Sequence, residues 1–159
     1  MIRETLIDSR QEILRTAARL FHIMSHAMDI TEEKVVNAVR GISDPEERLR
    51  MLIRRHLNVV LSVRDREITV MLHENHPLPP PLQKRINARK KDYIHFVENL
   101  IAEVQRLKRT NGVVSPRAAA FALLGMINWI YQWYRPDGAL LGEDLVRQYT
   151  DIFFAGAFQ

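Results

Sequence analysis

The stretch that decides the fold runs from Arg10 to Phe21 and reads RQEILRTAARLF. Its apolar side chains recur every three or four residues, which places them on one stripe of an amphipathic helix. The members of this stripe are Ile13, Leu14, Ala17, Leu20 and Phe21. Residues 23–29 follow directly with a second helical pattern. Unless another element covers the stripe, its large side chains are exposed to water.

Helix signals recur along the rest of the chain, whereas strand alternation does not. One apolar face runs from Met24 to Ile42, and Gly41 ends that helix. Asp44 then provides an N-cap and Pro45 a first helical residue, so the next helix begins there. Further helices are expected at residues 68–72, 82–109 (ending at Asn111-Gly112), 117–134 (capped by Ser115) and 143–157. The sequence therefore predicts an all-α fold.

The composition is that of a globular helical domain. The chain has 159 residues, of which 47% are hydrophobic and 26% charged, and its net charge is +4. It contains no cysteine, which excludes a disulfide framework and a thiolate metal site. The longest apolar stretch, Ala118 to Ile130, is too short to span a bilayer, and the N-terminus lacks the apolar core of a signal peptide. We therefore expect a cytoplasmic protein with no membrane partner.

Two motifs resemble TetR-family transcriptional regulators. Residues 10–21 resemble the first helix of the family's DNA-binding domain, and residues 23–29 resemble the fourth helix, which leads into the ligand-binding domain. Residues 123–129 and the WYRPDG turn at 133–138 are similar to TetR regulators of fatty-acid and acyl-CoA catabolism. The resemblance covers nearly the whole chain in element order. It implies a TetR-like helical bundle that dimerises through a four-helix bundle of its last two helices.

The resemblance divides the chain into two parts. Residues 1–22 would be the N-terminal arm and first helix of a helix-turn-helix domain, and residues 23–159 the ligand-binding and dimerisation domain. On this resemblance, the remainder of the helix-turn-helix would be missing between residues 22 and 23. Either the regulator has lost its DNA-binding helices, or a longer chain carries them; we favour the second, because the first leaves the apolar stripe exposed. DNA contacts are expected from that absent segment and from Arg3 and Arg10.

The resemblance also places a ligand pocket between the inner faces of several helices. Its expected lining is Leu57, Val60, Leu61, Met71, Tyr93, Phe96, Val97, Phe121, Leu124 and Asn128. This mostly apolar wall suits an acyl chain better than a sugar or a nucleotide. Asn128 is the polar exception, and its amide binds either a thioester or pantetheine group of a ligand or a neighbouring backbone carbonyl.

A basic cluster at the start of the 82–109 helix allows two interpretations. If Lys84, Arg85 and Arg89 border the pocket mouth, they would hold the phosphates of coenzyme A. Otherwise they form a solvated helix face. The effector expected from these patterns is a fatty acyl-CoA, and no permanent cofactor is expected.

The last two expected helices are apolar over more than one face, which indicates a twofold interface between subunits. The interface residues expected are Ala118, Ala122, Gly125, Trp129, Trp133, Tyr149 and Phe153. The alternative is that the same stripe packs inside one chain.

The remaining polar groups do not form a catalytic or metal signature. His73 and His76 have a spacing that can bring two imidazoles to one ion, and His22 and His26 lie one turn apart, but such residues are usually polar surface. No nucleophile elbow or glycine-rich phosphate loop occurs. We therefore expect no metal site and no enzyme. The function predicted is a dimeric, ligand-responsive repressor that an apolar effector releases from duplex DNA; the alternative is a ligand-binding or dimerisation module without DNA contact.

Overall fold

The computed structural model describes residues 2–62, 68, 71, 78–110 and 114–158, with side chains described from residue 11 onward. Within these residues the chain is helical and contains no strand. The α-helices are α1 (Ile2–Thr31), α2 (Pro45–Leu61), α4 (Pro80–Lys108), α5 (Pro116–Trp129) and α6 (Gly142–Ala157). A π-helical segment, η1 (Glu32–Asn37), continues α1, and a 3₁₀ turn, η2 (Ile130–Gln132), continues α5. The predicted all-α fold is confirmed.

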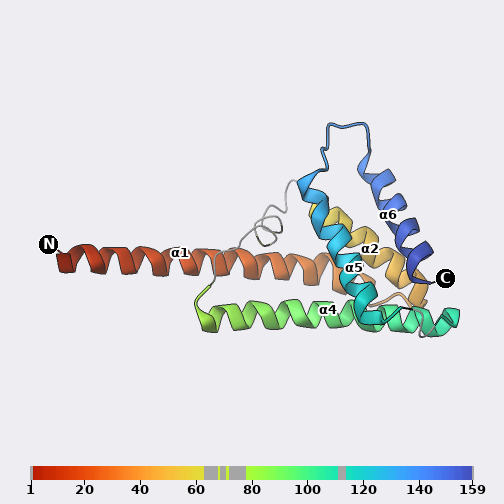
Figure 1. Ribbon diagram of the computed structural model, residues 1–159, viewed down its shortest axis with the longest axis horizontal. Coiled ribbons are helices and arrows are strands. Elements are labelled where there is room, and N and C mark those ends of the chain that lie inside the picture. Colours follow the sequence, from red (N-terminus) through yellow and green to blue (C-terminus); the bar gives the residue numbers. More distant parts are fainter. Residues whose placement is uncertain (1, 63–67, 69–70, 72–77, 111–113, 159) are drawn as a thin grey trace.

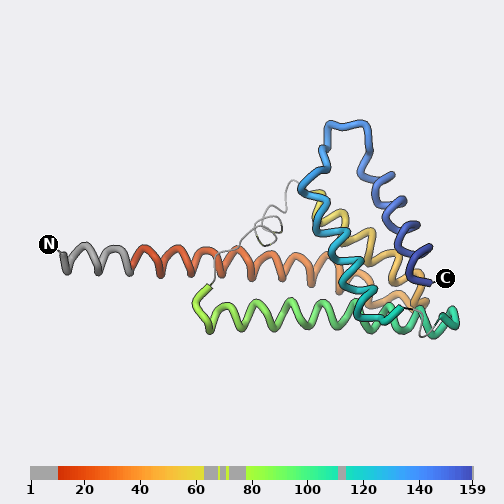
Figure 2. The backbone as a smooth tube through the Cα atoms, viewed as in Figure 1, coloured from red at the N-terminus to blue at the C-terminus, as the bar shows by residue number. Residues whose placement is uncertain are grey.

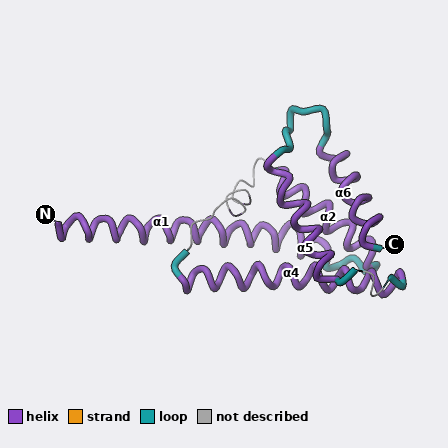
Figure 3. Tube along the Cα trace, in the orientation of Figure 1, coloured by secondary structure: helices purple, strands orange, loops and turns teal. Residues whose placement is uncertain are grey.

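The two longest helices, α1 and α4, lie side by side along the long axis of the molecule (Figure 1). The other three α-helices pack together near the C-terminal end of α1, while the N-terminal part of α1 extends away from them (Figure 2). A loop outside the bundle joins η2 to α6 (Figure 3). This arrangement brings α2, α4 and α5 together around one core and places α1 against α4.

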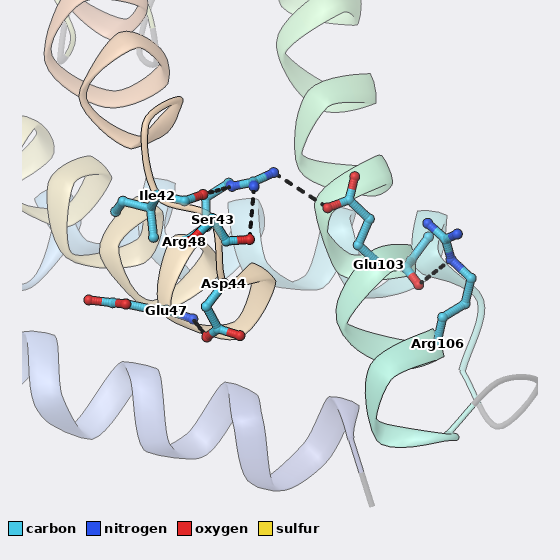
Figure 4. A network of polar contacts seen from close by, with 8 residues as sticks. Ile42, Ser43, Asp44, Glu47, Arg48, Glu103 and Arg106 are labelled. Atoms are coloured by element: carbon cyan, nitrogen blue, oxygen red, sulfur yellow. Dashed lines mark hydrogen bonds and ion pairs between the residues drawn. The ribbon is translucent and has the colours of Figure 1, made fainter.

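The start of α2 is fixed by the side chains that the sequence indicated. The Asp44 carboxylate accepts a hydrogen bond from the backbone N–H of Glu47 at 2.8 Å, and Pro45 occupies the first helical position. The Arg48 guanidinium donates to the Ile42 carbonyl at 2.7 Å and pairs with Glu103 of α4 at 3.4 Å (Figure 4). The N-cap prediction is confirmed, and Arg48 joins this cap to α4.

The ends of α4 and α5 show one agreement and one difference. Ser115 caps α5 as expected, since its hydroxyl accepts from the N–H of Ala118 at 3.1 Å. However, α4 ends at Lys108, before the expected Asn111-Gly112, because Arg109 adopts a left-handed conformation with φ of 58°. The N–H of Thr110 then donates to the Gln105 carbonyl at 3.0 Å, which closes the helix. Residues 111–113 lie outside the described part of the chain.

The hydrophobic core contains side chains from every α-helix of the bundle. Its fully buried large members are Leu49, Leu52, Ile53, Leu57, Ile101, Leu123, Ile127, Ile130 and Leu145. These positions recur with helical spacing, so each helix directs one apolar stripe inward. Burial of each such side chain stabilises the fold by about 1.5–3 kcal/mol.

Helix α1 is continuous where the sequence analysis expected two separate helices. It passes through residues 22 and 23 without a break. The side chain of Ile13 is 67% exposed and that of Leu14 is also exposed. Leu20 and Phe21 instead pack against a small apolar cluster with Met24 of α1 and Ile86 of α4. The stripe is therefore exposed at its N-terminal end and covered where α4 begins.

The short helix expected at residues 68–72 falls mostly outside the described residues. Of that segment only Ile68, which is buried, and Met71, which is partly buried, are described. His73 and His76 also lie outside them. Within the described ranges, no helix combines the length and the apolar character that crossing a membrane requires.

Candidate functional site

A polar cluster lies inside the apolar core where α2, α4 and α5 meet. His56 of α2 is only 6% exposed. The Tyr93 hydroxyl of α4 lies 2.8 Å from its Nδ1 atom, and the two rings meet edge to face with centroids 5.5 Å apart. The Asn128 side chain of α5 is a further hydrogen-bond partner of the imidazole. Three helices thus each contribute one polar side chain to this cluster.

The cluster is neutral at physiological pH. Burial lowers the pKa of His56 to about 4, because the charged imidazolium would lose its hydration, and the hydrogen bond with Asn128 offsets only part of this effect. Burial also raises the pKa of Tyr93, which keeps the phenol protonated. The three groups therefore form a hydrogen-bonded but uncharged cluster.

A cleft of about 190 Å³ lies between the C-terminal end of α1, the π-helical segment η1 and α4. Its apolar lining comes from Met28, Val36 and Phe96, and its polar lining from Thr31, Glu32, Arg40, Arg89, Asp92 and Tyr93. Tyr93 thus belongs both to the cleft and to the buried polar cluster. The cleft borders a π-helical segment, a rare conformation that is often found at functional sites.

The two arginines at this cleft are already paired. Arg89 donates to the backbone carbonyl of Ser25 at 3.0 Å and forms an ion pair with Asp29 at 2.8 Å. Arg40 pairs with Glu32 at 3.0 Å. The contacts of Arg89 join α4 to α1, so this arginine holds the two long helices together.

Most of the expected pocket residues lie together. Leu57, Val60, Val97 and Leu124 are buried in one core, and the partly buried residues packed against it include Leu61, Met71, Tyr93 and Phe96. Asn128 lies at His56. Phe121 differs, because its ring is 48% exposed and Arg117 lies over it at 5.4 Å. The structure therefore places Phe121 on the surface of α5, away from the other nine residues.

The basic cluster does not form one patch. Arg85 lies over the Phe21 ring at 4.8 Å, so it contacts α1, as Arg89 does. Lys84 instead lines a separate shallow groove with Leu78 and Lys91. Of the three residues expected to hold phosphates, only Arg89 lines the cleft beside Tyr93.

Sequence reasoning missed His56 as a site residue, although it assigned the neighbouring Leu57. The sequence signal was a histidine at a helical spacing that otherwise carries apolar residues. It also missed Met28, Thr31 and Val36, which line the cleft from α1 and η1. Their signal was the apolar face that continues through residues 24–42.

An exposed apolar face, formed by α5 and α6, contains most of the expected interface residues. Ala118, Ala122 and Gly125 are exposed, Trp129 is 63% exposed, and a Cβ atom built at Gly125 would meet nothing within 4 Å. Trp133 is exposed and stacks on the partly buried Tyr149, with ring centroids 6.5 Å apart. Phe153, in contrast, is 5% exposed and packs against Phe154 and Phe158. Phe153 thus lies in the core of the single chain and not on the exposed face.

Within the described ranges, His, Asp and Glu side chains form no group of three or more that could hold a metal ion. His22 and His26 are exposed on α1.

Comparisons with known proteins place this geometry in a family. Residues 43–157 match the family model of the tetracyclin repressor-like, C-terminal domain. A search of curated proteins found no match. Among solved structures, the chain is similar to AibR in complex with isovaleryl coenzyme A and operator DNA, at 34% identity and a TM-score of 0.79 over 86% of this chain and 73% of AibR. Apo AibR aligns at 34% identity and a TM-score of 0.74, over 84% of this chain and 71% of that one.

A second solved relative is a transcriptional regulator of the TetR/AcrR family from Thermobifida fusca YX-ER1. It is 27% identical, with a TM-score of 0.70 over 86% of this chain and 72% of the regulator. Because the family model covers most of the chain and AibR exceeds 30% identity over most of its own length, these matches identify more than a shared fold. The chain belongs to the TetR family of transcriptional regulators, which are transcription factors and not enzymes.

Proposed function

We propose that the protein is a dimeric, ligand-responsive repressor whose effector is an acyl-CoA. The observation that carries this proposal is the similarity to AibR, which was crystallised with both isovaleryl coenzyme A and operator DNA and is 34% identical over 86% of this chain. The mostly apolar core with one neutral polar cluster supports an effector that combines an acyl chain with a carbonyl group. A regulator of this kind acts where the DNA is, so we assign it to the cytoplasm.

The position of the cleft supplies a physical route from ligand to DNA. Met28 and Thr31 of α1 line it from one side, and Tyr93 and Phe96 of α4 line it from the other. A ligand in the cleft therefore contacts the helix that leads towards the N-terminus. It releases DNA if it binds better to the state in which α1 has moved relative to α4.

Coenzyme A phosphates would act on the contacts between these two helices. Arg89 binds Ser25 and Asp29 of α1, and Arg85 contacts Phe21. A phosphate that took over either guanidinium would weaken its contact with α1. Lys84 supplies a further cation on the same helix.

We propose that two copies of the chain bind one stretch of DNA. We infer that the exposed face at Ala118, Ala122, Gly125, Trp129 and Trp133 pairs with its twofold mate to form a four-helix bundle. The dimer would present two DNA-binding units about 34–36 Å apart, the spacing of successive major grooves. Arg3 and Arg10 lie on α1, with side chains outside the described part, and we propose that they add phosphate contacts to those of helices absent from this sequence.

A gel-shift assay tests this function. The protein as the cell produces it is mixed with duplex DNA from upstream of its own gene, over a range of salt concentrations and with or without isovaleryl-CoA. We expect retention at low salt that weakens as salt rises, because phosphate contacts release counterions, and further release of DNA by isovaleryl-CoA. Coenzyme A alone is the matched control. Failure to retain DNA at low salt would contradict the regulator, and retention unaffected by any acyl-CoA would contradict the effector.

The alternative function, a ligand-binding or dimerisation module without DNA contact, is supported by one observation. Helix α1 passes without a break through residues 22 and 23, where the family resemblance expected the helix-turn-helix. The same gel shift separates the two functions, because the module would retain no DNA even at low salt.

A further inference from the structure

We propose that the π-helical segment η1, here called the π turn, is a hinge between α1 and the rest of the bundle. Its one surplus residue would serve this movement and not the packing of the core. The inference rests on the proposed function for its ligand, isovaleryl-CoA, and deepens it, because it assigns the part of the chain through which the cleft acts on α1. The spacing of the buried residues on either side of the π turn carries it.

The π turn lies inside a continuous helix and not at its end. Thr31 before it and Ala38 after it both have α-helical backbone angles, with φ of −62° and −65°. A π turn closes its hydrogen bonds over five residues, whereas an α turn closes them over four. A wide turn with regular helix on both sides therefore holds one residue more than an uninterrupted α-helix.

The buried residues show where this surplus residue lies. Ile30 and Val35 belong to the same core cluster, although they are five residues apart. In an α-helix, at about 3.6 residues per turn, five residues would turn the second side chain about 140° away from the first. The π turn takes up one residue and so directs both side chains into the core. Three exposed residues separate them, Glu32, Glu33 and Lys34, and the surplus residue is one of these three.

The same core fits a regular α-helix that is one residue shorter. Without Glu33, Val35 would follow Ile30 by four residues, which is the α-helical spacing of one face. Val36 would follow Met28 by seven residues, so both would still line the cleft. The core packing therefore does not require the π turn.

Contacts on both sides of the π turn place the hinge there. Before it, Arg89 of α4 pairs with Asp29 of α1 at 2.8 Å. After it, Arg48 donates to the Ile42 carbonyl at 2.7 Å and pairs with Glu103 of α4 (Figure 4). When α1 shifts at the first contact while the second contact holds, the segment between them must change its geometry. The π turn lies in that segment.

The π turn also forms one wall of the cleft. Thr31, Glu32 and Val36 line the cleft from this side, and Tyr93 and Phe96 line it from α4. Sharp bends in helices occur at π turns, because their hydrogen-bond ladder is already interrupted. A ligand that widens the cleft would therefore bend the helix at the π turn and tilt α1 relative to α4.

Deletion of Glu33 tests whether the surplus residue is needed for folding. This variant replaces the π turn by an α turn, so its Tm should lie within about 4 °C of the wild type or above it. Deletion of Asn99, an exposed residue inside α4, is the control, because it rotates the rest of that helix by about 100°. It should lower Tm by more than about 10 °C. An equal loss in both deletion variants would overturn the inference, because the core would then need the surplus residue.

Spin labels test whether the π turn is the hinge. The chain has no cysteine, so Arg19→Cys on α1 and His95→Cys on α4 create two unique labelling sites at exposed positions. Residue 19 lies about 20 Å along the helix from the π turn, so a tilt of about 6° moves its label by about 2 Å. Isovaleryl-CoA should produce such a shift in the labelled chain of natural length but none in the Glu33 deletion. Without ligand, the deletion should also show the narrower distance distribution.

Glu33→Ala is the matched control for the deletion, because it removes the side chain and keeps the chain length. It should respond to isovaleryl-CoA like the wild type. An equal shift in the deletion and in the wild type would overturn the inference, as would bound isovaleryl-CoA that shifts neither. If calorimetry detects no binding of isovaleryl-CoA, the proposed effector is wrong, and equal ligand-free distributions would then overturn the hinge. A hinge seen by the labels in a protein that retains no DNA would contradict the proposed function alone.

Discussion

His56 differs strongly in protonation between the folded and the unfolded chain. Its pKa is about 4 in the core, against 6.5 in an exposed histidine. Between these values the unfolded chain binds a proton that the folded chain does not bind, so the free energy of unfolding falls as the pH is lowered from about 6.5 to about 4. The gap between the two pKa values corresponds to about 3 kcal/mol.

This linkage predicts the behaviour of His56→Gln, which keeps a hydrogen-bonding side chain but cannot titrate. In urea unfolding, the free energy of unfolding of the wild type should fall between pH 7 and pH 5. This fall should be about 2 kcal/mol larger in the wild type than in the variant. His95→Gln is the control, because His95 is exposed on α4. This variant should lose as much free energy of unfolding between pH 7 and pH 5 as the wild type does. Equal losses in wild type and His56→Gln would show that His56 is not held neutral by the core.

The sequence could not identify His56 and Tyr93 as partners. They are 37 positions apart, and their contact depends on how α2 packs against α4. A histidine on an apolar helix face has the same sequence pattern whether it supports the core or a ligand. The apolar walls at Leu57, Val97 and Leu124 were easier to predict, because helical spacing alone directs them inward.

At the scale of the element, the helix boundaries with local signals were predictable. Asp44 and Ser115 each cap a helix with a hydrogen bond that their sequence neighbours determine. The end of α4 was not predictable, because Arg109 adopts a left-handed conformation where Asn111-Gly112 supplied the expected signal. The continuity of α1 was also missed. The apolar positions Phe21, Met24 and Met28 keep one helical phase through the point where the resemblance separated two helices.

Asp44→Ala tests the contribution of one cap. The variant loses the acceptor of the Glu47 N–H, which typically costs about 1 kcal/mol. For a chain of 159 residues this should lower Tm by about 2–4 °C in thermal unfolding followed by circular dichroism. Asp137→Ala, in the exposed turn before α6, should leave Tm almost unchanged. A Tm for Asp44→Ala equal to that of this control would mean that Arg48 and its contacts alone fix the start of α2.

At the scale of the whole molecule, the exposed face on α5 and α6 predicts a dimer that depends on Trp129. Trp129→Ala should weaken association of the two subunits by about 2–4 kcal/mol, because it removes a large aromatic side chain from an interface that excludes water. Sedimentation equilibrium should then show a shift towards monomer at low micromolar concentration. Leu107→Ala, which truncates an exposed leucine on α4, should sediment like the wild type. A fully dimeric Trp129→Ala would assign the interface to another surface.

Phe153→Ala separates core from interface. Phe153 is buried among Phe154 and Phe158, so its loss should destabilise the folded chain by about 3–5 kcal/mol in urea unfolding. The sequence could not make this distinction, because both Trp129 and Phe153 lie on apolar stripes of helices that pack on two sides. Which stripe faces the partner depends on the rotation of each helix within the bundle.

The extension of α1 beyond the bundle gives small movements a large effect. About twenty residues of this helix precede its apolar contact with α4 at Phe21, and at about 1.5 Å per residue they span about 30 Å. A tilt of about 5° at the Arg89 contacts would therefore carry the far end about 2–3 Å, roughly the length of one hydrogen bond. Arg89 also lines the cleft, so a ligand that shifts the contacts between α1 and α4 should move the N-terminal end of α1 by a distance of this order.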